Sequence, residues 1–440
     1  MTASGRRLCV SALAVAGFFV PTTARAQTPV PSPSPGPSTS PTGAATSAPT
    51  TAAPSDLAEI EKSLAADAAA ATAATQASHD STAPAAAGHG AISFNPDISF
   101  ILDVAAAAFS EDEPRQDGGH DPARNGFSLQ QLELAVGKAV DPYFRFDAAI
   151  VFSPFGVEIE EAFATAVALP GSLQIRAGQF LTRFGRHNPT HLHAWEFLDQ
   201  PFVWSRVFGG EGNRGAGLEL SYLTPLPWYV ELLASATDAA GEATARSFWG
   251  ARDLGVSRPQ DLQYTLGLRQ FFPFSDDLSL LLGLSSAFGP NPTGHHNRSE
   301  IHGGDLYLKY RPVAATNHLT VALQAEALWR RRQIPGDALS DGGGYAQLLF
   351  RFAQRWSLAG RYEYGTPVWN RAGAVAIDYL DPLWNGHRQR AALALTFSPT
   401  EFSRLRLQAS RDSTSAAQPT IWAGILALEI LAGHHGAHPF

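Results

Sequence analysis

Hydrophobic and polar residues alternate along the chain from Phe94 onward, in segments of about ten residues separated by Pro, Gly, Asp and Ser. In DLYLKYR (residues 305–311), leucines and one tyrosine occupy one side of an extended segment, and the charged residues occupy the other. WSLAGRYEY (356–364) and SRLRLQAS (403–410) repeat the pattern. Alternation with a period of two is typical of strands that lie between an apolar and a polar environment, so we expect an all-β fold.

Sixteen segments of this kind follow one another, at residues 96–109, 127–139, 143–152, 157–168, 172–180, 217–223, 228–236, 262–272, 278–288, 305–311, 319–330, 345–352, 356–364, 388–397, 403–410 and 421–431. Short turns alternate with longer connections, and we expect loops over residues 181–212, 238–260, 289–301, 331–341 and 366–385. An even number of strands with short turns on one side and longer loops on the other predicts a transmembrane antiparallel up-and-down β-barrel of about 16 strands.

Aromatic residues near the strand ends separate this prediction from a soluble all-β protein, whose strands would alternate as well. They lie on the expected apolar faces, at Phe144, Phe152, Tyr222, Trp228, Tyr264, Phe397 and Trp422. Outer-membrane barrels carry such aromatic girdles at both membrane interfaces, so the membrane barrel is the preferred interpretation.

The N-terminal region divides into a signal and a linker. Residues 1–26 combine Arg6 and Arg7, an apolar core and Ala-Arg-Ala, the layout of a cleaved secretory signal. Residues 27–90 form a low-complexity Pro/Ala/Ser/Thr linker, a disordered tether with a short helix at 56–76. The barrel then covers 91–433 and a His-rich tail covers 434–440. The single cysteine, Cys9, lies in the signal, so we expect no disulfide in the mature chain.

A sixteen-strand barrel leaves an aqueous lumen, so we expect passive diffusion of small solutes through it. The candidate lumen wall consists of charged residues on the polar faces, basic over the later strands and acidic over the earlier ones. These are Arg269, Lys309, Arg311, Arg351, Arg361, Arg388, Arg390, Arg404, Arg406, Glu133, Asp147, Glu219 and Glu231. The excess of arginine predicts a mild anion preference. The alternative is that these charges pair with one another across the lumen.

The stretch RFGRHNPTHLHAW (183–195) opens the longest expected loop, directly after the fifth strand. The loop carries the charges of a pore constriction, for which the candidates are Arg176, Arg183, Arg186, Glu196, Asp199 and Arg206. The spacing of His187, His191 and His193 is also compatible with a metal site. In an extended loop, His191 and His193 point the same way, whereas His187 must fold back to join them. No cofactor is required, and zinc is a secondary candidate ligand.

Several motifs resemble those of known barrel proteins. EEAFATAVALPGSLQIRAGQFLTRFG (160–185) is similar to a segment of the phosphate-selective porins O and P. FNPDISFILD (94–103), VEIEEAF (157–163) and H-x-H-x-W-x-F-x-D-x-P (191–201) resemble a family of exported barrel proteins described as zinc-regulated outer-membrane receptors. The porin resemblance implies that residues 181–212 fold into the lumen and narrow it. The lysine ladder of the phosphate-selective members is missing, since the chain has only Lys62, Lys138 and Lys309.

These observations favour a porin-like channel in the cell outer membrane, with membrane lipid, lipopolysaccharide and small solutes as partners. A net charge of -8 without a basic run is against nucleic-acid binding. The sequence contains no G-x-S-x-G, P-loop or H-E-x-x-H motif, so we do not expect an enzyme. A substrate- or zinc-specific uptake protein is the alternative function, with a barrel enzyme more remote. A homotrimer is an option that the sequence leaves open.

Overall fold

The computed structural model describes residues 96–433, except 155, 242, 253–254, 295, 316–317, 379–380, 382–385 and 416–417. These residues belong to the compact unit Ser93–Phe440. The expected signal (1–26), linker (27–90, with its helix at 56–76) and His-rich tail (434–440) lie outside the described residues.

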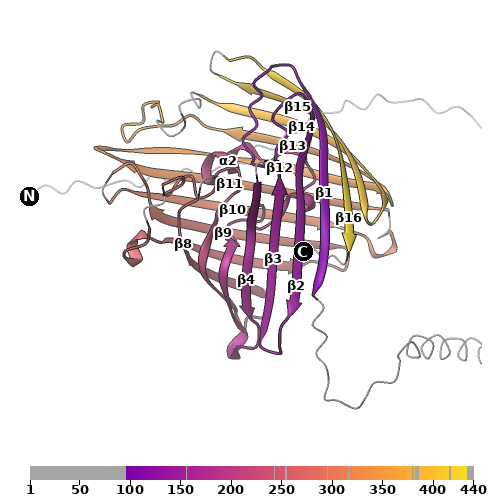
Figure 1. Ribbon diagram of the computed structural model, residues 1–440, viewed down its shortest axis with the longest axis horizontal. Helices are drawn as coiled ribbons and strands as arrows, with labels where there is room; N and C mark the ends of the chain where they lie inside the picture. Colours follow the sequence, from indigo (N-terminus) through magenta and orange to yellow (C-terminus); the bar gives the residue numbers. More distant parts are fainter. Residues whose placement is uncertain are drawn as a thin grey trace, which may run out of the picture. The chain divides into compact units, whose positions relative to one another are not determined.

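Sixteen antiparallel strands form a closed barrel, in which each strand is hydrogen-bonded to its neighbours in the chain and β1 pairs with β16 (Figure 1). The strands are β1 (Asp97–Phe109), β2 (Gly126–Ala139), β3 (Phe144–Ser153), β4 (Gly156–Ala166), β5 (Leu173–Leu181), β6 (Arg214–Leu223), β7 (Tyr229–Thr237), β8 (Gln263–Pro273), β9 (Leu278–Pro290), β10 (Arg298–Tyr310), β11 (Thr320–Ile334), β12 (Asp337–Ala353), β13 (Trp356–Gly365), β14 (Arg388–Thr400), β15 (Ser403–Thr414) and β16 (Ile421–Gly433). The prediction of a 16-strand up-and-down barrel is confirmed.

The helical elements are short and lie in the connections between strands. They are η1 (Pro170–Ser172), η2 (Leu192–Ala194), α2 (Phe202–Phe208), η3 (Pro259–Asp261) and η4 (Val313–Ala315). Among the described residues, no helix has both the length and the apolar character that a membrane-crossing helix requires.

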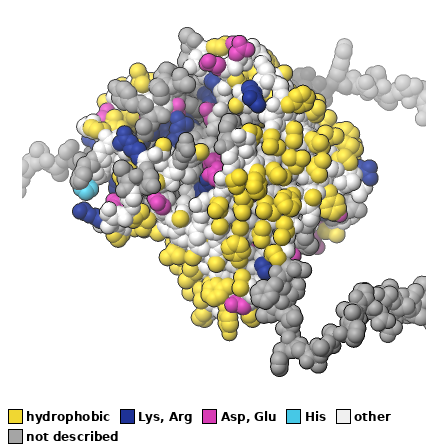
Figure 2. All heavy atoms as spheres, viewed as in Figure 1, with side chains coloured by type: hydrophobic (Ala, Val, Ile, Leu, Met, Phe, Trp, Pro, Cys, Tyr) yellow, Lys and Arg dark blue, Asp and Glu magenta, His cyan; other side chains and the backbone are white. Residues whose placement is uncertain are grey.

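The two faces of the strands follow the alternation in the sequence. In β10, Ile301 and Asp305 are buried on the inner side, whereas Tyr310 is exposed. In β13, Arg361 and Glu363 are buried on the inner side. Figure 2 shows hydrophobic side chains gathered over the outer face of the strands turned to the viewer, β1 and β16 among them. The barrel therefore has an apolar outer surface and a charged interior, as the sequence predicts.

Two expected loops are shorter in the structure than the sequence predicts. β10 begins at Arg298, so the loop expected at 289–301 is shorter. β11 and β12 continue to a tight turn at Pro335 and Gly336, where a loop over 331–341 was expected. The cause is that these strand ends carry charges on both faces: the Arg331–Glu300 pair lies outside, and the salt bridge from Arg330 to Asp341 lies inside. Without an apolar face, these ends do not show the alternation of the other strands.

Two β-bulges break the alternation where the sequence repeats a polar residue. In β2 the pairing with β1 skips Gln130, and in β4 the pairing with β3 skips Glu160. A bulge inserts one extra residue and re-aims the side chains beside it. As a result, Gln130 and Gln131 are both buried, and Glu160 and Glu161 both face the lumen.

Gly178 lies on β5, in the segment 160–185 that resembles the phosphate-selective porins. It has a φ of 137°, and a Cβ there would lie 2.2 Å from the carbonyl oxygen of Ala162 on β4. The close approach of β4 and β5 thus requires glycine, because both the backbone angle and the space exclude a side chain. Three residues after Gly178, β5 ends at Leu181 and the chain leaves the barrel wall.

Replacing Gly178 with alanine is expected to destabilise the barrel by about 2 kcal/mol or more, from backbone strain and the forced separation of β4 and β5. The measurement is the urea midpoint of the purified protein, followed by tryptophan fluorescence. Gly424→Ala is the matched control, because a Cβ at Gly424 meets nothing within 4 Å. Equal midpoints for the two variants would contradict the interpretation.

Candidate functional site

Residues 182–213, here the lumen loop, leave the end of β5 and fold into the barrel, where α2 lies inside the ring of strands (Figure 1). Three polar side chains close the base of the loop. The side-chain amide of Asn188 donates to the carbonyls of Thr182 (2.8 Å) and Asn213 (2.9 Å). The amide of Asn213 in turn donates to the hydroxyl of Thr182 at 2.7 Å. These hydrogen bonds hold the two ends of the loop together at its base.

The apolar side of α2 packs against the barrel wall inside the lumen. Its sequence FVWSRVF is buried throughout and joins a hydrophobic cluster with Phe184, Phe248, Ile301 and Leu328. The wall leaves space for these side chains, because a Cβ on Gly303 would lie 2.8 Å from Phe184. The sequence analysis expected residues 181–212 to fold into an aqueous lumen and narrow it, but it did not predict an apolar core there.

The positive charges at the start of the loop face the acidic wall. The guanidinium of Arg183 donates to Glu219 on β6 and to Glu231 on β7, both at 2.7 Å. Arg176, on β5 itself, donates to the same Glu219 at 2.8 Å. Two candidate constriction residues and two candidate wall residues thus form one ion-pair network.

Asp199, further along the loop, lies against the basic wall. It is fully buried and pairs with Arg361 on β13 and with Arg390 on β14, the latter at 3.0 Å. Gln408 on β15 donates to the same carboxylate at 2.9 Å. Next to it, Glu363 on β13 accepts the backbone N–H of Phe202 at 2.7 Å. Asp199 is therefore an anchor of the loop and does not line an open pore.

Arg206 on α2 anchors the other end of the loop. Its guanidinium lies 3.0 Å from Asp341 on β12 and 3.3 Å from Asp381, and it donates to the carbonyl of Thr366 at 3.1 Å. Burial lowers the pKa of Arg206 to about 10, even though the adjacent carboxylates raise it. The group remains a cation at neutral pH.

Most of the remaining wall arginines also bind loop segments. Arg406 donates to the carbonyl of Trp195 at 3.0 Å, and Arg404 pairs with Glu429 on β16 and donates to the carbonyl of His193. Arg388 binds Asp412 at 2.8 Å and, in the first long loop, Asp117 at 2.6 Å.

Arg269 on β8 donates to the carbonyl of Gly185 at 2.9 Å. The wall arginines described above thus pair with loop residues or with adjacent strands, whereas the alternative interpretation expected them to pair with other wall charges across the lumen.

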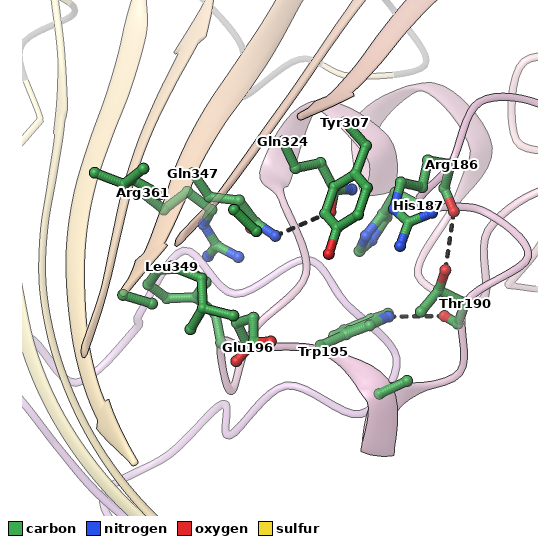
Figure 3. Close-up of a pocket in the computed structure, with 15 residues that line it drawn as sticks. Arg186, His187, Thr190, Trp195, Glu196, Tyr307, Gln324, Gln347, Leu349 and Arg361 are labelled. Atoms are coloured by element: carbon green, nitrogen blue, oxygen red, sulfur yellow. Dashed lines mark hydrogen bonds between the residues drawn. The ribbon is translucent and has the colours of Figure 1, made fainter. Parts of the chain in front are cut away.

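A cavity of about 90 Å³ remains between the lumen loop and the wall of β10–β13 (Figure 3). Arg186 and Glu196 line it from the loop, and Tyr307, Gln324 and Arg361 line it from the wall. The guanidinium of Arg186 lies over the Tyr307 ring, 3.8 Å from its centroid. Of the six candidate constriction residues, Arg186 and Glu196 line this cavity.

Two larger cavities lie beyond the loop. One of about 1060 Å³ is at the short-turn end of the barrel, next to the turns after β12 and β14, and is here the inner vestibule. The other, of about 760 Å³, is at the long-loop end and is lined by residues 111–117, Arg206 and Arg388, among others. The inner vestibule shares Ala194 and Glu196 with the 90 Å³ cavity, so the two adjoin.

The other candidate wall residues lie in different surroundings. Arg351 lines the inner vestibule with Arg355, and the charges near Lys309 are those of Arg186, Arg311 and Arg351. Asp147 pairs with Arg145 at 2.7 Å near the short-turn end, where Arg145 is half exposed.

The three loop histidines occupy two different environments. His187 packs between the rings of Trp195 (4.7 Å between centroids), Trp204 (5.7 Å) and Tyr345 (6.0 Å). Burial lowers its pKa to about 3, with a smaller contribution from Arg361, so the ring is neutral. His187 is therefore a histidine of the aromatic core, and the structure separates it from the other two.

His191 and His193 stack on each other, with ring centroids 5.7 Å apart, and face the acidic wall. Nδ1 of His191 lies 3.0 Å from Glu160, and Nε2 lies 3.0 Å from Glu161. Nδ1 of His193 lies 3.0 Å from Glu133 on β2. Burial opposes protonation of His191, but the charges of Glu160 and Glu133 raise its pKa well above 6.5.

Neither Glu160 nor Glu161 was predicted as a partner of the loop histidines. The signal that could have identified them is the Glu-Glu pair inside an alternating strand, because two adjacent charges in such a strand indicate a bulge.

A second His–Glu pair joins the first long loop to the lumen loop. Nε2 of His120 lies 3.2 Å from Glu211, and Nδ1 lies 3.1 Å from the carbonyl oxygen of Gln130. Burial alone would lower the pKa of His120, but the hydrogen bond and charge of Glu211 raise it to about 9. His120 is therefore protonated at neutral pH, and its contact with Glu211 fastens the outer side of the lumen loop.

Solved structures of outer-membrane channels share the barrel fold. DcaP, an outer-membrane channel of Acinetobacter baumannii, matches with a TM-score of 0.54 and 12% identity over 79% of this chain and 100% of that one. An anion-selective porin from Comamonas acidovorans matches with a TM-score of 0.50 and 9% identity over 77% of this chain and 99% of that one. Identities this low show the fold alone.

The chain belongs to the same family as an uncharacterised protein of Aquifex aeolicus (strain VF5). The two are 31% identical over 386 residues, which cover 79% of this chain and 80% of the relative. No family model matches the sequence. The resemblance to phosphate-selective porins and to zinc-regulated receptors stays a prediction.

Asp199→Asn is expected to destabilise the protein by roughly 3–5 kcal/mol, because it leaves the buried charges of Arg361 and Arg390 undercompensated. Urea unfolding followed by tryptophan fluorescence measures the loss. Asp147→Asn is the matched control: its partner Arg145 is 51% exposed, so the change should cost less than about 1 kcal/mol. A similar cost for both would show that Asp199 is no anchor.

The His120–Glu211 pair predicts a pH dependence of stability. Because the pKa of His120 is raised from 6.5 to about 9 in the folded state, the stabilisation is complete below pH 6.5 and is lost as the pH rises through about 9. The melting temperature of the wild type should exceed that of Glu211→Gln at pH 7, and the difference should shrink above pH 9. A difference that stays constant from pH 6 to pH 10 would contradict the assignment.

Proposed function

We propose that the protein is a porin-like channel of the outer membrane through which small solutes diffuse passively, with a preference for anions. The observation that carries the proposal is the polar cavity beside the lumen loop. The loop narrows the lumen without filling it, and Arg186, Glu196 and Arg361 surround the remaining space. The cavity adjoins the inner vestibule, which fits a route along the β10–β13 wall.

The short turns and both chain ends of the barrel would face the periplasm, as is usual for outer-membrane barrels. The outer face would contact membrane lipid and lipopolysaccharide. The homotrimer stays an open prediction.

The anion preference rests on the charges that line the proposed route. Many other wall charges are engaged in ion pairs with the lumen loop, so they contribute little net field. Near the proposed route, Lys309 lies close to Arg186, Arg311 and Arg351, and Arg355 lines the same vestibule as Arg351. A cluster of like charges raises the local concentration of counter-ions in a channel. The anion-selective porin of Comamonas acidovorans has the same fold.

A metal-specific uptake protein is the second candidate. It is favoured by His191, which the structure brings together with Glu133 and Glu160 in the lumen. Large ohmic currents whose mean conductance is unaffected by chelators would favour the diffusion channel. Closed channels, or currents blocked by micromolar zinc, would favour the metal-specific protein.

The purified protein is placed in planar bilayers under a KCl gradient. The sign of its reversal potential should correspond to a higher permeability for chloride than for potassium. Lys309→Ala combined with Arg351→Ala should lower the anion-to-cation permeability ratio at least roughly twofold. The reason is that a unit charge about 10 Å from a permeating ion contributes on the order of 0.4 kcal/mol in water. Arg258→Ala, at an exposed position before η3, is the control and should leave the ratio unchanged. Cation selectivity of the wild type would overturn the proposed preference.

A further inference from the structure

We propose that His191, Glu133 and Glu160 bind one divalent transition-metal ion that fastens the lumen loop to the barrel wall. Among the described residues, these three form the group whose potential metal-ligand atoms all lie within 4.8 Å of one another. His191 belongs to the loop, Glu133 to β2 and Glu160 to β4. An ion bound by all three would connect segments that are otherwise joined only by hydrogen bonds and ion pairs.

The distances fit a small divalent ion. Nδ1 of His191 lies 3.0 Å from Oε2 of Glu160 and 3.9 Å from Oε1 of Glu133. Bonds of about 2.0–2.1 Å in a tetrahedral zinc site place the ligand atoms roughly 3.3 Å apart. The observed distances lie on both sides of this value, so small side-chain rotations bring the three atoms into position.

The charges fit as well. One imidazole nitrogen and two carboxylate oxygens are a ligand set that zinc, cobalt and similar ions accept. The carboxylates of Glu133 and Glu160 neutralise a divalent cation, which lowers the cost of holding it in a buried site. Both carboxylates are largely shielded from solvent, with side-chain exposures of 2% and 13%.

The neighbouring residues supply the orientation that metal ligands usually have. Nε2 of His191, the nitrogen that would not bind the ion, lies 3.0 Å from Glu161. The second oxygen of Glu133 lies 3.0 Å from Nδ1 of His193. Carboxylate–histidine–metal arrangements of this kind fix the tautomer and the orientation of the ligating ring. The bulge at Glu160 makes the arrangement possible, because it directs one carboxylate to each side of His191.

The direct test is Zn²⁺ titration of the full chain, purified in detergent and treated with chelator, against a chromophoric competitor. We expect one ion per chain. Glu161→Gln should weaken binding about 10–100-fold, the range for loss of an orienting partner, and His191→Gln or Glu160→Gln should weaken it more. His302→Gln is the control, since this histidine stacks on Trp329 in β10–β11 and should leave binding unchanged. Heat-modifiable gel migration verifies that each variant folds.

Absorption of bound Co²⁺ gives a second measurement, because its visible band should be lost in His191→Gln. Failure of the wild type to bind Zn²⁺, or binding that survives His191→Gln, would overturn the metal site.

The effect on the channel rests on the proposed function and is measured separately, by comparing bilayer currents with and without chelator. Metal removal should increase current fluctuations as the loop loosens, and unchanged fluctuations would overturn the fastening role. If the protein binds zinc but conducts no current in either condition, the metal site stands and the proposed channel fails.

Discussion

A charged group inside a protein is stable only where it is paired with an opposite charge or satisfied by hydrogen bonds. This constraint determines how the interior of the barrel is arranged. The wall is acidic on one side and basic on the other. The lumen loop carries the complementary charges in the right order, with Arg183 and the two stacked histidines toward the acidic side and Asp199 toward the basic side. The position of the loop follows from this match, and the place of the remaining cavity follows from the position of the loop.

The same principle shows why the architecture was predictable from the sequence. Alternation in β10, β13 and β15 arises because one face of each strand contacts an apolar environment and the other face contacts the barrel interior. The strands and the direction of their side chains can therefore be predicted directly from the sequence. The long loop after β5 was predicted from its length and position. The extended ends of β11 and β12 were missed, because charges on both faces remove the periodic signal there.

The candidate site was less predictable, because it depends on which distant side chains meet. Arg361 and Arg388 were expected to face the pore, but their partners Asp199 and Asp117 lie 162 and 271 residues away in the chain. His187 and His191 are four residues apart and look equivalent in the sequence. The structure places one in an aromatic core and the other among carboxylates. Only the environment of His191 contains carboxylates that a cation would neutralise. The extra residue of the bulge in β4, Glu160, supplies one of them.

The anchoring of the lumen loop also has a consequence for the order of assembly. The loop follows β5, yet its contacts reach Glu363 on β13 and Gln408 on β15, 161 and 210 residues further along the chain. Contacts of such long sequence separation form late, because a large loop of chain must close before they are gained. The Asp199 side of the loop therefore stays without its partners until β13, β14 and β15 are in place. We expect this side of the loop to dock at the late stage of assembly at which β1 closes against β16.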